Sequence, residues 1–225
     1  MLVGLISDVH SNATALKAVL SEMDKIGVEK ILHAGDIIGY NPYPNETIEM
    51  FIENKITSIL GNHDRAIITD DISDFNPYAA AALLWTKRVL SPEHFGYIQT
   101  LKNREHFTRD NIHIVAIHGS PRDVDEYVFP VNVNAHFLAD AKADVLVLGH
   151  THVQFKKEYT QGIVLNPGSV GQPRDENPDA AFAVYDTGTN LAKLKRISYD
   201  IEKVIEDMRN AHLPDKLGLR LRYGL

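Results

Sequence analysis

The chain has 225 residues, of which 44% are hydrophobic and 24% are charged, and its formal net charge is −7. This composition is that of a globular protein with a sizeable core, and it excludes a disordered or fibrous chain. The acidic balance and the lack of a Lys/Arg cluster argue against general nucleic-acid binding. There is no cysteine, which excludes disulfides, thiolate metal sites and a cysteine nucleophile and fits a cytoplasmic location.

The N-terminal part of the chain alternates apolar runs with helical patterns. We predict strands and helices in the order β-α-β-α-β over residues 2–6, 13–27, 30–35, 45–55 and 56–60. This order implies a parallel sheet with right-handed crossovers. The first apolar run is too short for a signal peptide or a membrane span, so we expect no membrane attachment.

The remainder of the chain is expected to add helices and short strands to the same domain, 1–225. Two helical patterns, 76–90 and 91–103, lie in a helical insertion at about 66–105. Short strands follow, over 107–110, 112–118, 145–150, 155–159, 162–166, 180–186 and 191–199, before a closing helix at 199–212. The tail 217–225 alternates apolar and basic residues, which favours an edge strand or a subunit contact and leaves the oligomeric state open.

Short polar clusters follow five of the predicted strands. In chain order they contribute Asp8 and His10, then Asp36, then Asn62 and His63, then His118, and finally His150 and His152. Ligands of open α/β sheets bind outside the carboxyl ends of the strands, so these side chains are expected to converge. In "DVH" and "HTH", strand alternation would turn residues i and i+2 toward the same side.

The donor types indicate a metal centre. Imidazole, carboxylate and amide oxygen without thiolate suit divalent manganese, iron, zinc, cobalt or nickel. One catalytic metal needs three or four protein ligands, and this set is too large for one ion. It fits two ions that share a bridge, roughly 3.5–4 Å apart, an arrangement that hydrolyses phosphate esters. Each cluster alone could be a turn with a satisfied side chain, and it is their joint occurrence that favours metal.

The motifs together resemble those of the calcineurin-like metallophosphoesterases. They read "DVH" (8–10), "GD" (35–36), "GNHD" (61–64), "HG" (118–119) and "GHTH" (149–152). The segments 35–49, "GDIIGYNPYPNETIE", and 166–175, "NPGSVGQPRD", are similar to the small prokaryotic phosphodiesterase branch. The resemblance implies a four-layer α/β/β/α sandwich of two mixed sheets flanked by helices, with the metal site at the C-terminal ends of the strands.

The resemblance also implies a role for each motif residue. Two divalent ions, manganese first, with iron, zinc, nickel or cobalt as alternatives, would share the bridging carboxylate of Asp36. One would be held by Asp8, His10 and His152, and the other by Asn62, His118 and His150. His63 would contact the phosphate and act as general acid while a metal-bridging hydroxide attacks phosphorus. The implied substrate is a small phosphodiester or a phosphomonoester.

The sequence departs from two other branches of this family. Protein Ser/Thr phosphatases and symmetrical dinucleoside tetraphosphatases continue "GD" as G-D-x-V-D-R-G, whereas this chain has Gly39 and Tyr40 at the second Asp and the Arg. The departure leaves the residue that orients His63 open, with adjacent Asp64 as one candidate. The alternative function is a non-catalytic scaffold on the same fold, as in a retromer subunit.

Two further polar residues are candidate substrate contacts. Arg174 in "GQPRD" could reach the substrate or be a solvated loop residue. Asn12 in "DVHSN" could reach the phosphate or cap the helix that follows, and capping is the favoured reading. The aromatic residues of the insertion, Tyr78, Trp85 and Phe95, could roof the site, although a core position is favoured for them.

Overall fold

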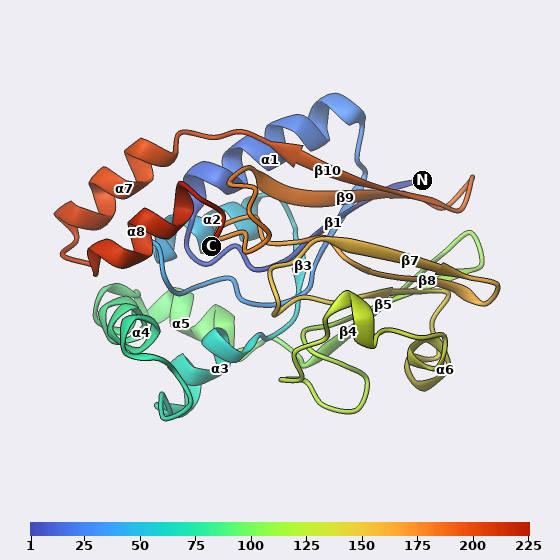
Figure 1. The fold of residues 1–225 in the computed structure, drawn as a ribbon, viewed down its shortest axis with the longest axis horizontal. Coiled ribbons are helices and arrows are strands. Elements are labelled where there is room, and N and C mark those ends of the chain that lie inside the picture. The colour runs from blue at the N-terminus through green and yellow to red at the C-terminus, as the bar shows by residue number, and fades with distance from the viewer.

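Two five-stranded mixed sheets lie face to face in the computed structural model, which describes residues 1–225 (Figure 1). The first sheet has the order β10-β9-β1-β2-β3, formed by Leu191–Ile197, Ala180–Asp186, Leu2–Ile6, Lys30–His33 and Thr57–Ser58. The second has the order β4-β5-β6-β8-β7, formed by Arg104–Arg109, Ile112–Ile117, Val145–Val147, Gly162–Asn166 and Phe155–Tyr159. Each sheet contains three parallel strands, β1-β2-β3 at one edge of the first and β5-β6-β8 within the second, and the remaining strands pair antiparallel.

Helices cover the outer faces of both sheets, which confirms the predicted four-layer sandwich. Their bounds are α1 Ala13–Ile26, α2 Pro44–Glu53, α3 Asn62–Thr69, α4 Pro77–Val89, α5 Pro92–Gln99, α6 His136–Ala141, α7 Ile201–Asn210 and α8 Asp215–Leu221, with a 3-10 turn at Pro130–Asn132. In Figure 1, α1 lies along the first sheet, α6 lies under the second, and α7 and α8 pack together at one end. No helix combines the length and apolarity that crossing a bilayer requires.

The core forms as layers because strand residues alternate between faces. Val3 and Leu5 of β1 pack between the two sheets against Ile114 of β5, whereas Ile6 faces α1 and packs against Leu16. All five are fully buried. Burying side chains of this size stabilises the fold by about 1.5–3 kcal/mol each, so β1 is anchored on both faces. This anchoring fixes the position of the loop that follows β1.

The tail 217–225 is the clearest difference from the predicted elements. The edge-strand interpretation is wrong, because the tail contributes most of helix α8. Leu217 and Leu221, four residues apart, are buried against Ile205 and Met208 of α7. The alternation of apolar and basic residues hid this helical spacing, in which positions i and i+4 share one face.

Smaller differences concern two helices and the predicted insertion. Helix α3 begins already at Asn62, before the predicted insertion, and α6, between β5 and β6, was not predicted. Of the insertion's aromatic residues, Trp85 and Phe95 pack against buried clusters, as the core interpretation favoured, but Tyr78 is 42% exposed. None of the three lines the pocket described below.

Candidate metal centre and substrate pocket

The structure brings together all eight residues that follow the predicted strands. Asp8 and His10 follow β1, Asp36 follows β2, Asn62 and His63 open α3 directly after β3, His118 follows β5, and His150 and His152 follow β6. The parallel strands of both sheets end at this edge, so their loops meet there. The expectation that the clusters converge is therefore met, and the assignment of ligand roles to individual residues stays a prediction.

One half of the centre is formed by Asp8, His10 and His152. The Nε2 atoms of the two imidazoles lie 3.0 Å apart. The Oδ1 atom of Asp8 lies 3.3 Å from Nε2 of His152 and 3.8 Å from Nε2 of His10. All three side chains are buried, with at most 2% of the residue surface exposed. Three donor atoms thus converge on one point that solvent barely reaches.

The other half is formed by Asn62, His118 and His150. The Oδ1 atom of Asn62 lies 3.1 Å from Nε2 of His118. The rings of His118 and His150 have their centroids 4.9 Å apart, and Nε2 of His150 is buried without a hydrogen-bond partner. An unpartnered buried nitrogen costs free energy, so a ligand role would satisfy it.

Asp36 lies between the two halves. Its Oδ2 atom is 3.5 Å from Nε2 of His10 and 3.4 Å from Nε2 of His118. The side chain belongs to two of the three groups of residues whose donor atoms are close enough to hold one ion, and it shares one of these groups with Asp8 and His118. A carboxylate in this position is suited to bridge two cations.

The histidines are oriented so that Nε2 faces the centre. The Nδ1 atoms of His10, His118 and His152 lie 3.1, 2.7 and 2.5 Å from the carbonyl oxygens of Ile38, Ala34 and Gln172. Because a carbonyl can only accept, each Nδ1 carries a proton, and in the neutral ring Nε2 therefore presents a lone pair. The lone pairs of His10 and His152 therefore face each other and would repel without a cation between them. The donor set therefore fits divalent metal ions, because a cation would relieve the repulsion between the two facing lone pairs.

The backbone that presents these side chains adopts left-handed conformations. The φ angles are 53° at Asp8, 48° at His10, 64° at Asp36, 68° at His150 and 60° at His152. Residues other than glycine rarely adopt this region, and strain of this kind gathers at functional sites. The expectation that residues i and i+2 face one side is met by Asp8 and His10, which lie in the same half, although the backbone there is left-handed and no longer a strand. It is wrong for His150 and His152, which lie in different halves of the centre.

Charges inside the cluster hold both carboxylates in the ionised form. Burial alone would raise the pKa of Asp36, but the neighbouring imidazoles, that of His118 first, outweigh it and hold the pKa well below its usual value. The same balance, with His152 as the main partner, lowers the pKa of Asp8. Burial would lower the pKa of His118, but the negative charge of Asp36 prevails and raises it to about 9. The cluster therefore presents anionic oxygens to a cation.

His63 stands at the boundary between the metal centre and solvent. Its ring contacts those of His10 and Tyr40, with centroids 4.6 and 4.5 Å away, and meets Phe75 edge-on at 4.8 Å. A Cβ atom on Gly39 would lie 2.5 Å from Nδ1 of His63, and that nitrogen has no hydrogen-bond partner. Packing against aromatic rings and Gly39, rather than a carboxylate, orients the imidazole here.

Asp64 does not orient His63, which answers the question left open by the sequence. Its carboxylate accepts hydrogen bonds from the backbone N–H groups of Asp36, Ile37, Ile38 and Gly61, at 3.0–3.2 Å. Asp64 therefore ties the loop that carries Asp36 to the start of α3. Burial, with the nearby charge of Asp36, raises its pKa to about 7. Its position three residues after the N-cap Gly61 is the sequence signal for this role.

The two candidate substrate contacts differ in their surroundings. Asn12 caps α1, because its side chain accepts from the N–H of Ala15 and donates to the carbonyl of Gly171. Both ends of this buried amide are therefore occupied, as the capping alternative requires. Arg174 is not a solvated loop residue. It is half-buried, and its Nη2 atom donates to the hydroxyl of Tyr40 at 3.1 Å and to the side chain of Gln172 at 3.0 Å.

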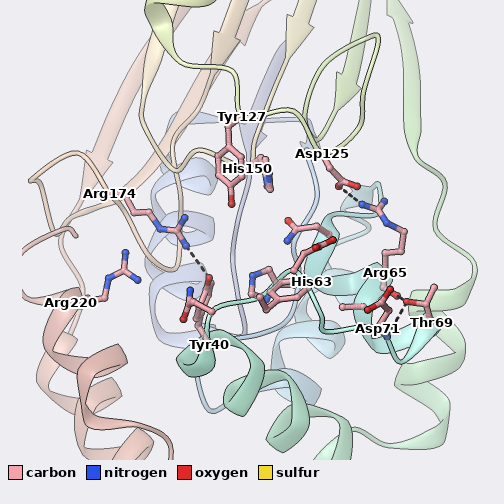
Figure 2. A pocket seen from close by; sticks show the side chains of 15 residues that line it. Tyr40, His63, Arg65, Thr69, Asp71, Asp125, Tyr127, His150, Arg174 and Arg220 are labelled. Atoms are coloured by element: carbon pink, nitrogen blue, oxygen red, sulfur yellow. Dashed lines mark hydrogen bonds and ion pairs between the residues drawn. The ribbon is translucent and has the colours of Figure 1, made fainter.

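A cavity of about 600 Å³ opens directly over the centre (Figure 2). Its walls include His63, Asn62, His150, Tyr40, Tyr127, Phe75, Arg174 and Arg220. The ring of Tyr127 lies 3.8 Å from that of His150, centroid to centroid. Sequence reasoning missed Tyr127, Phe75 and Arg220, and for Arg220 the strand-like pattern of the tail pointed away from this position.

Comparison with known proteins agrees with the geometry. Residues 1–190 match the model of the calcineurin-like phosphoesterase superfamily domain. The chain is 34% identical to the uncharacterized protein MJ0912 of Methanocaldococcus jannaschii, over 99% of this chain and 98% of that one. It is 29% identical to a probable metallophosphoesterase of Methanothermobacter thermautotrophicus, over 79% and 82% of the two chains.

A solved structure supports the same grouping over the whole chain. The metallophosphoesterase of Sphaerobacter thermophilus superposes with a TM-score of 0.87 at 33% identity, covering 100% of this chain and 99% of that one. This chain belongs to the calcineurin-like phosphoesterase superfamily, as the motif resemblance predicted. It is a metallophosphoesterase-family protein with a candidate dinuclear His/Asp site.

Proposed function

We propose that the protein hydrolyses phosphodiesters with two divalent metal ions and with His63 as the general acid. The observation that carries the proposal is the place of Asp36, whose Oδ2 atom lies about equally far from the donor nitrogens of His10 and His118. A single-metal site would need no carboxylate between two separate ligand groups. Manganese is the first candidate, since oxygen and imidazole donors suit it.

The protein residues have distinct parts in the proposed reaction. When bound, the two ions supply an activated water and offset charge on the phosphate. Asn62, in the pocket wall, and His63 would face the phosphate at the mouth of the centre. His63 would then give a proton to the departing oxygen, an effect of typically ~10²–10⁴-fold. Burial lowers the pKa of His63 to about 4, and the negative charge of a bound phosphate would favour the protonated form.

The preference for diesters rests on the open pocket. A phosphodiester places one ester arm on each side of phosphorus, and both arms need room. A cavity of about 600 Å³ beside His63 has a size typical of small-molecule sites and could hold a second arm. A phosphomonoester would fit the same pocket and would leave part of it to solvent, so monoester hydrolysis is proposed as a secondary activity.

The experiment compares wild type, His63→Ala and His136→Ala with bis(4-nitrophenyl) phosphate and 4-nitrophenyl phosphate after manganese loading. We expect wild type to prefer the diester and His63→Ala to lose at least about 10²-fold in kcat/KM. His136 is an exposed histidine at the start of α6, so its replacement should change little. Turnover in His63→Ala equal to that of the control would contradict the general-acid assignment.

Wild-type protein that binds metal but hydrolyses neither ester would instead favour the non-catalytic scaffold. Elemental analysis of the same samples, which counts metal ions per chain, separates that outcome from a failure to load the site. The physiological substrate would be a small phosphate ester, because a cavity of about 600 Å³ has the size of a small-molecule site.

A further inference from the structure

Two arginines face one side of the pocket without an Asp or Glu side chain as a partner. Arg174 comes from the loop after β8, and Arg220 comes from helix α8, 46 residues further along the chain. The one arginine of the pocket lining that does pair with such a side chain is Arg65, which lies on the other side with Asp125. Figure 2 shows Arg174 and Arg220 next to each other, on the side of His63 away from Asp125 and Asp71.

The guanidinium of Arg174 has protein partners that carry no negative charge. Nη2 donates to the hydroxyl of Tyr40 and the amide oxygen of Gln172, and Nε is buried without any partner. The Tyr40 ring, 5.6 Å from the guanidinium carbon, supports the group from one face. These contacts orient the guanidinium group of Arg174 toward the pocket, but they leave its positive charge uncompensated.

Arg220 approaches the same place from the C-terminal helix. Its Nε atom donates to the main-chain oxygen of Leu225 at 2.6 Å, and its other nitrogens have no hydrogen bond within the protein. Arg220 and Arg174 line the same pocket and lie next to each other in Figure 2, and burial, followed by the charge of Arg174, lowers the pKa of Arg220. Helix α8 is held by buried Leu217 and Leu221, so Arg220 is carried there by a packed element.

The opposite side of the pocket has a different charge pattern. There Arg65 forms an ion pair with Asp125, and Asp71 and Asp74 also line the wall. The wall formed by Arg174 and Arg220 therefore carries positive charge that no Asp or Glu side chain pairs with, whereas the opposite wall holds a paired arginine and two further acidic residues. Two neighbouring cations that repel each other are stabilised when an anion lies between them.

A phosphodiester alone does not account for these arginines. Its one negative charge would already be offset by two divalent ions held by the two carboxylates Asp8 and Asp36. The arginine wall therefore offers more positive charge than the reacting phosphate requires. Arginine forks bind phosphate and carboxylate groups through two parallel hydrogen bonds, which makes them suited to a second anionic group on the same molecule.

We propose that Arg174 and Arg220 form a second anion subsite, and that the substrate is a phosphoester with a further phosphate on the ester arm that points toward α8. The proposal rests on the proposed function for the position of the reacting phosphate. Arg174 and Arg220 would be specificity residues, and helix α8, beyond the residues 1–190 matched by the family model, would contribute directly to substrate choice.

The test measures binding rather than turnover. Manganese-loaded protein is titrated by calorimetry with thymidine 3′,5′-bisphosphate and with thymidine 5′-phosphate, which lacks the second phosphate, and each titration is repeated in the His63→Ala background, in which hydrolysis of these monoesters is suppressed. We expect wild type to bind the bisphosphate at least about tenfold more tightly, since one charge-assisted pair contributes that much. In Arg174→Ala and Arg220→Ala the ratio of the two affinities should fall to within about twofold.

Two further variants serve as controls for the loss of a nearby charge and for the loss of side-chain packing. Arg222→Ala removes an arginine of the same helix end that pairs with Glu202, and it should keep the wild-type ratio. Arg220→Gln removes the charge but keeps the Cβ and Cγ atoms and a polar end, and it should lower the ratio of the two affinities as the alanine variant does. Equal affinities for the two probes in wild type, or a ratio unchanged in both Arg220 variants, would overturn the subsite.

Failure of the subsite and failure of the proposed function give different results. Loss of the subsite alone leaves bis(4-nitrophenyl) phosphate hydrolysis in wild type, with no preference for the bisphosphate probe. Loss of the proposed function alone leaves the affinity ratio and its dependence on Arg220, with no hydrolysis of the diester.

Discussion

The two halves of the metal centre differ in their access to solvent. One half, formed by Asp8, His10 and His152, is buried beneath the pocket. The other half contributes Asn62 and His150 to the wall of the open pocket, beside His63. In the sealed half, both histidines are held by Nδ1 hydrogen bonds to backbone carbonyls. In the pocket half, His118 is held in the same way by the carbonyl of Ala34, but His150 has an unpartnered nitrogen and rests against Tyr127, which is 54% exposed.

The contrast indicates a division of work within one centre. The sealed half is positioned before any ligand arrives, because its donors are fixed by the fold on every side. The pocket half is where a substrate can approach an ion directly. Asp36 belongs to both halves, and a change there should affect the whole centre.

Replacement of Asp36 should have the largest effect. Asp36→Asn keeps the shape of the side chain and removes the charge shared by both halves. We expect loss of at least about 10³-fold in kcat/KM, because several kcal/mol of charge stabilisation depend on the ions. Elemental analysis should show fewer ions per chain. Wild-type metal content together with wild-type activity in Asp36→Asn would contradict a carboxylate shared by two ions.

Removal of one histidine from each half tests whether the sealed half holds metal more tightly than the pocket half. His152→Ala opens the sealed half and should lower metal retention during dialysis against a chelator far more than His150→Ala does. The reason is that the sealed half is preorganised and excludes water, which strengthens each metal–ligand interaction. Equal metal loss in the two variants would show that the halves do not differ in affinity.

Asp64→Asn should have an intermediate effect. The amide keeps one acceptor oxygen but cannot accept from all four N–H groups that now converge on the carboxylate. The loop that carries Asp36 should loosen, and activity should fall roughly 10–100-fold, as for other residues that position metal ligands. Thermal denaturation followed by circular dichroism provides the check on folding, and a variant with wild-type kinetics would remove Asp64 from the positioning network.

Gly39→Ala should have the smallest effect of the set on metal content. Gly39 has φ +103°, and an added Cβ would press on Nδ1 of His63. We expect a loss of about 1–3 kcal/mol in the free energy of unfolding, with lower kcat and with both metal ions retained. The measurement combines urea denaturation with metal analysis, and loss of an ion would mean that Gly39 supports the metal centre rather than His63.

The residues of the centre could be predicted from the sequence because each lies at the end of a buried strand. The strand anchors the chain on both faces, as Val3, Leu5 and Ile6 do for β1, so the loop that follows has little freedom. Asp8, His10 and Asp36 thus follow from local patterns. The direction of each side chain could not be predicted from these patterns, because it depends on left-handed turns that no strand pattern encodes.

The residues that shape the pocket could not be predicted in the same way. Arg220 reaches the pocket only because Leu217 and Leu221 dock α8 on α7, a tertiary contact between distant segments. The partners of Asp64 are likewise backbone groups from 26–28 residues away or across the helix start, set by the close approach of two loops. Tertiary packing, rather than a sequence motif, determines the position of Arg220 and the backbone groups that Asp64 binds.

Electron paramagnetic resonance during titration of metal-free protein with Mn²⁺ would decide whether Asp36 is shared between two ions. Two ions that share the carboxylate of Asp36 would interact magnetically. We expect uptake of two Mn²⁺ per chain and the spectrum of a spin-coupled pair, which Asp36→Asn abolishes. Saturation at one ion, or two ions that give only the spectrum of isolated Mn²⁺, would contradict a shared dinuclear centre.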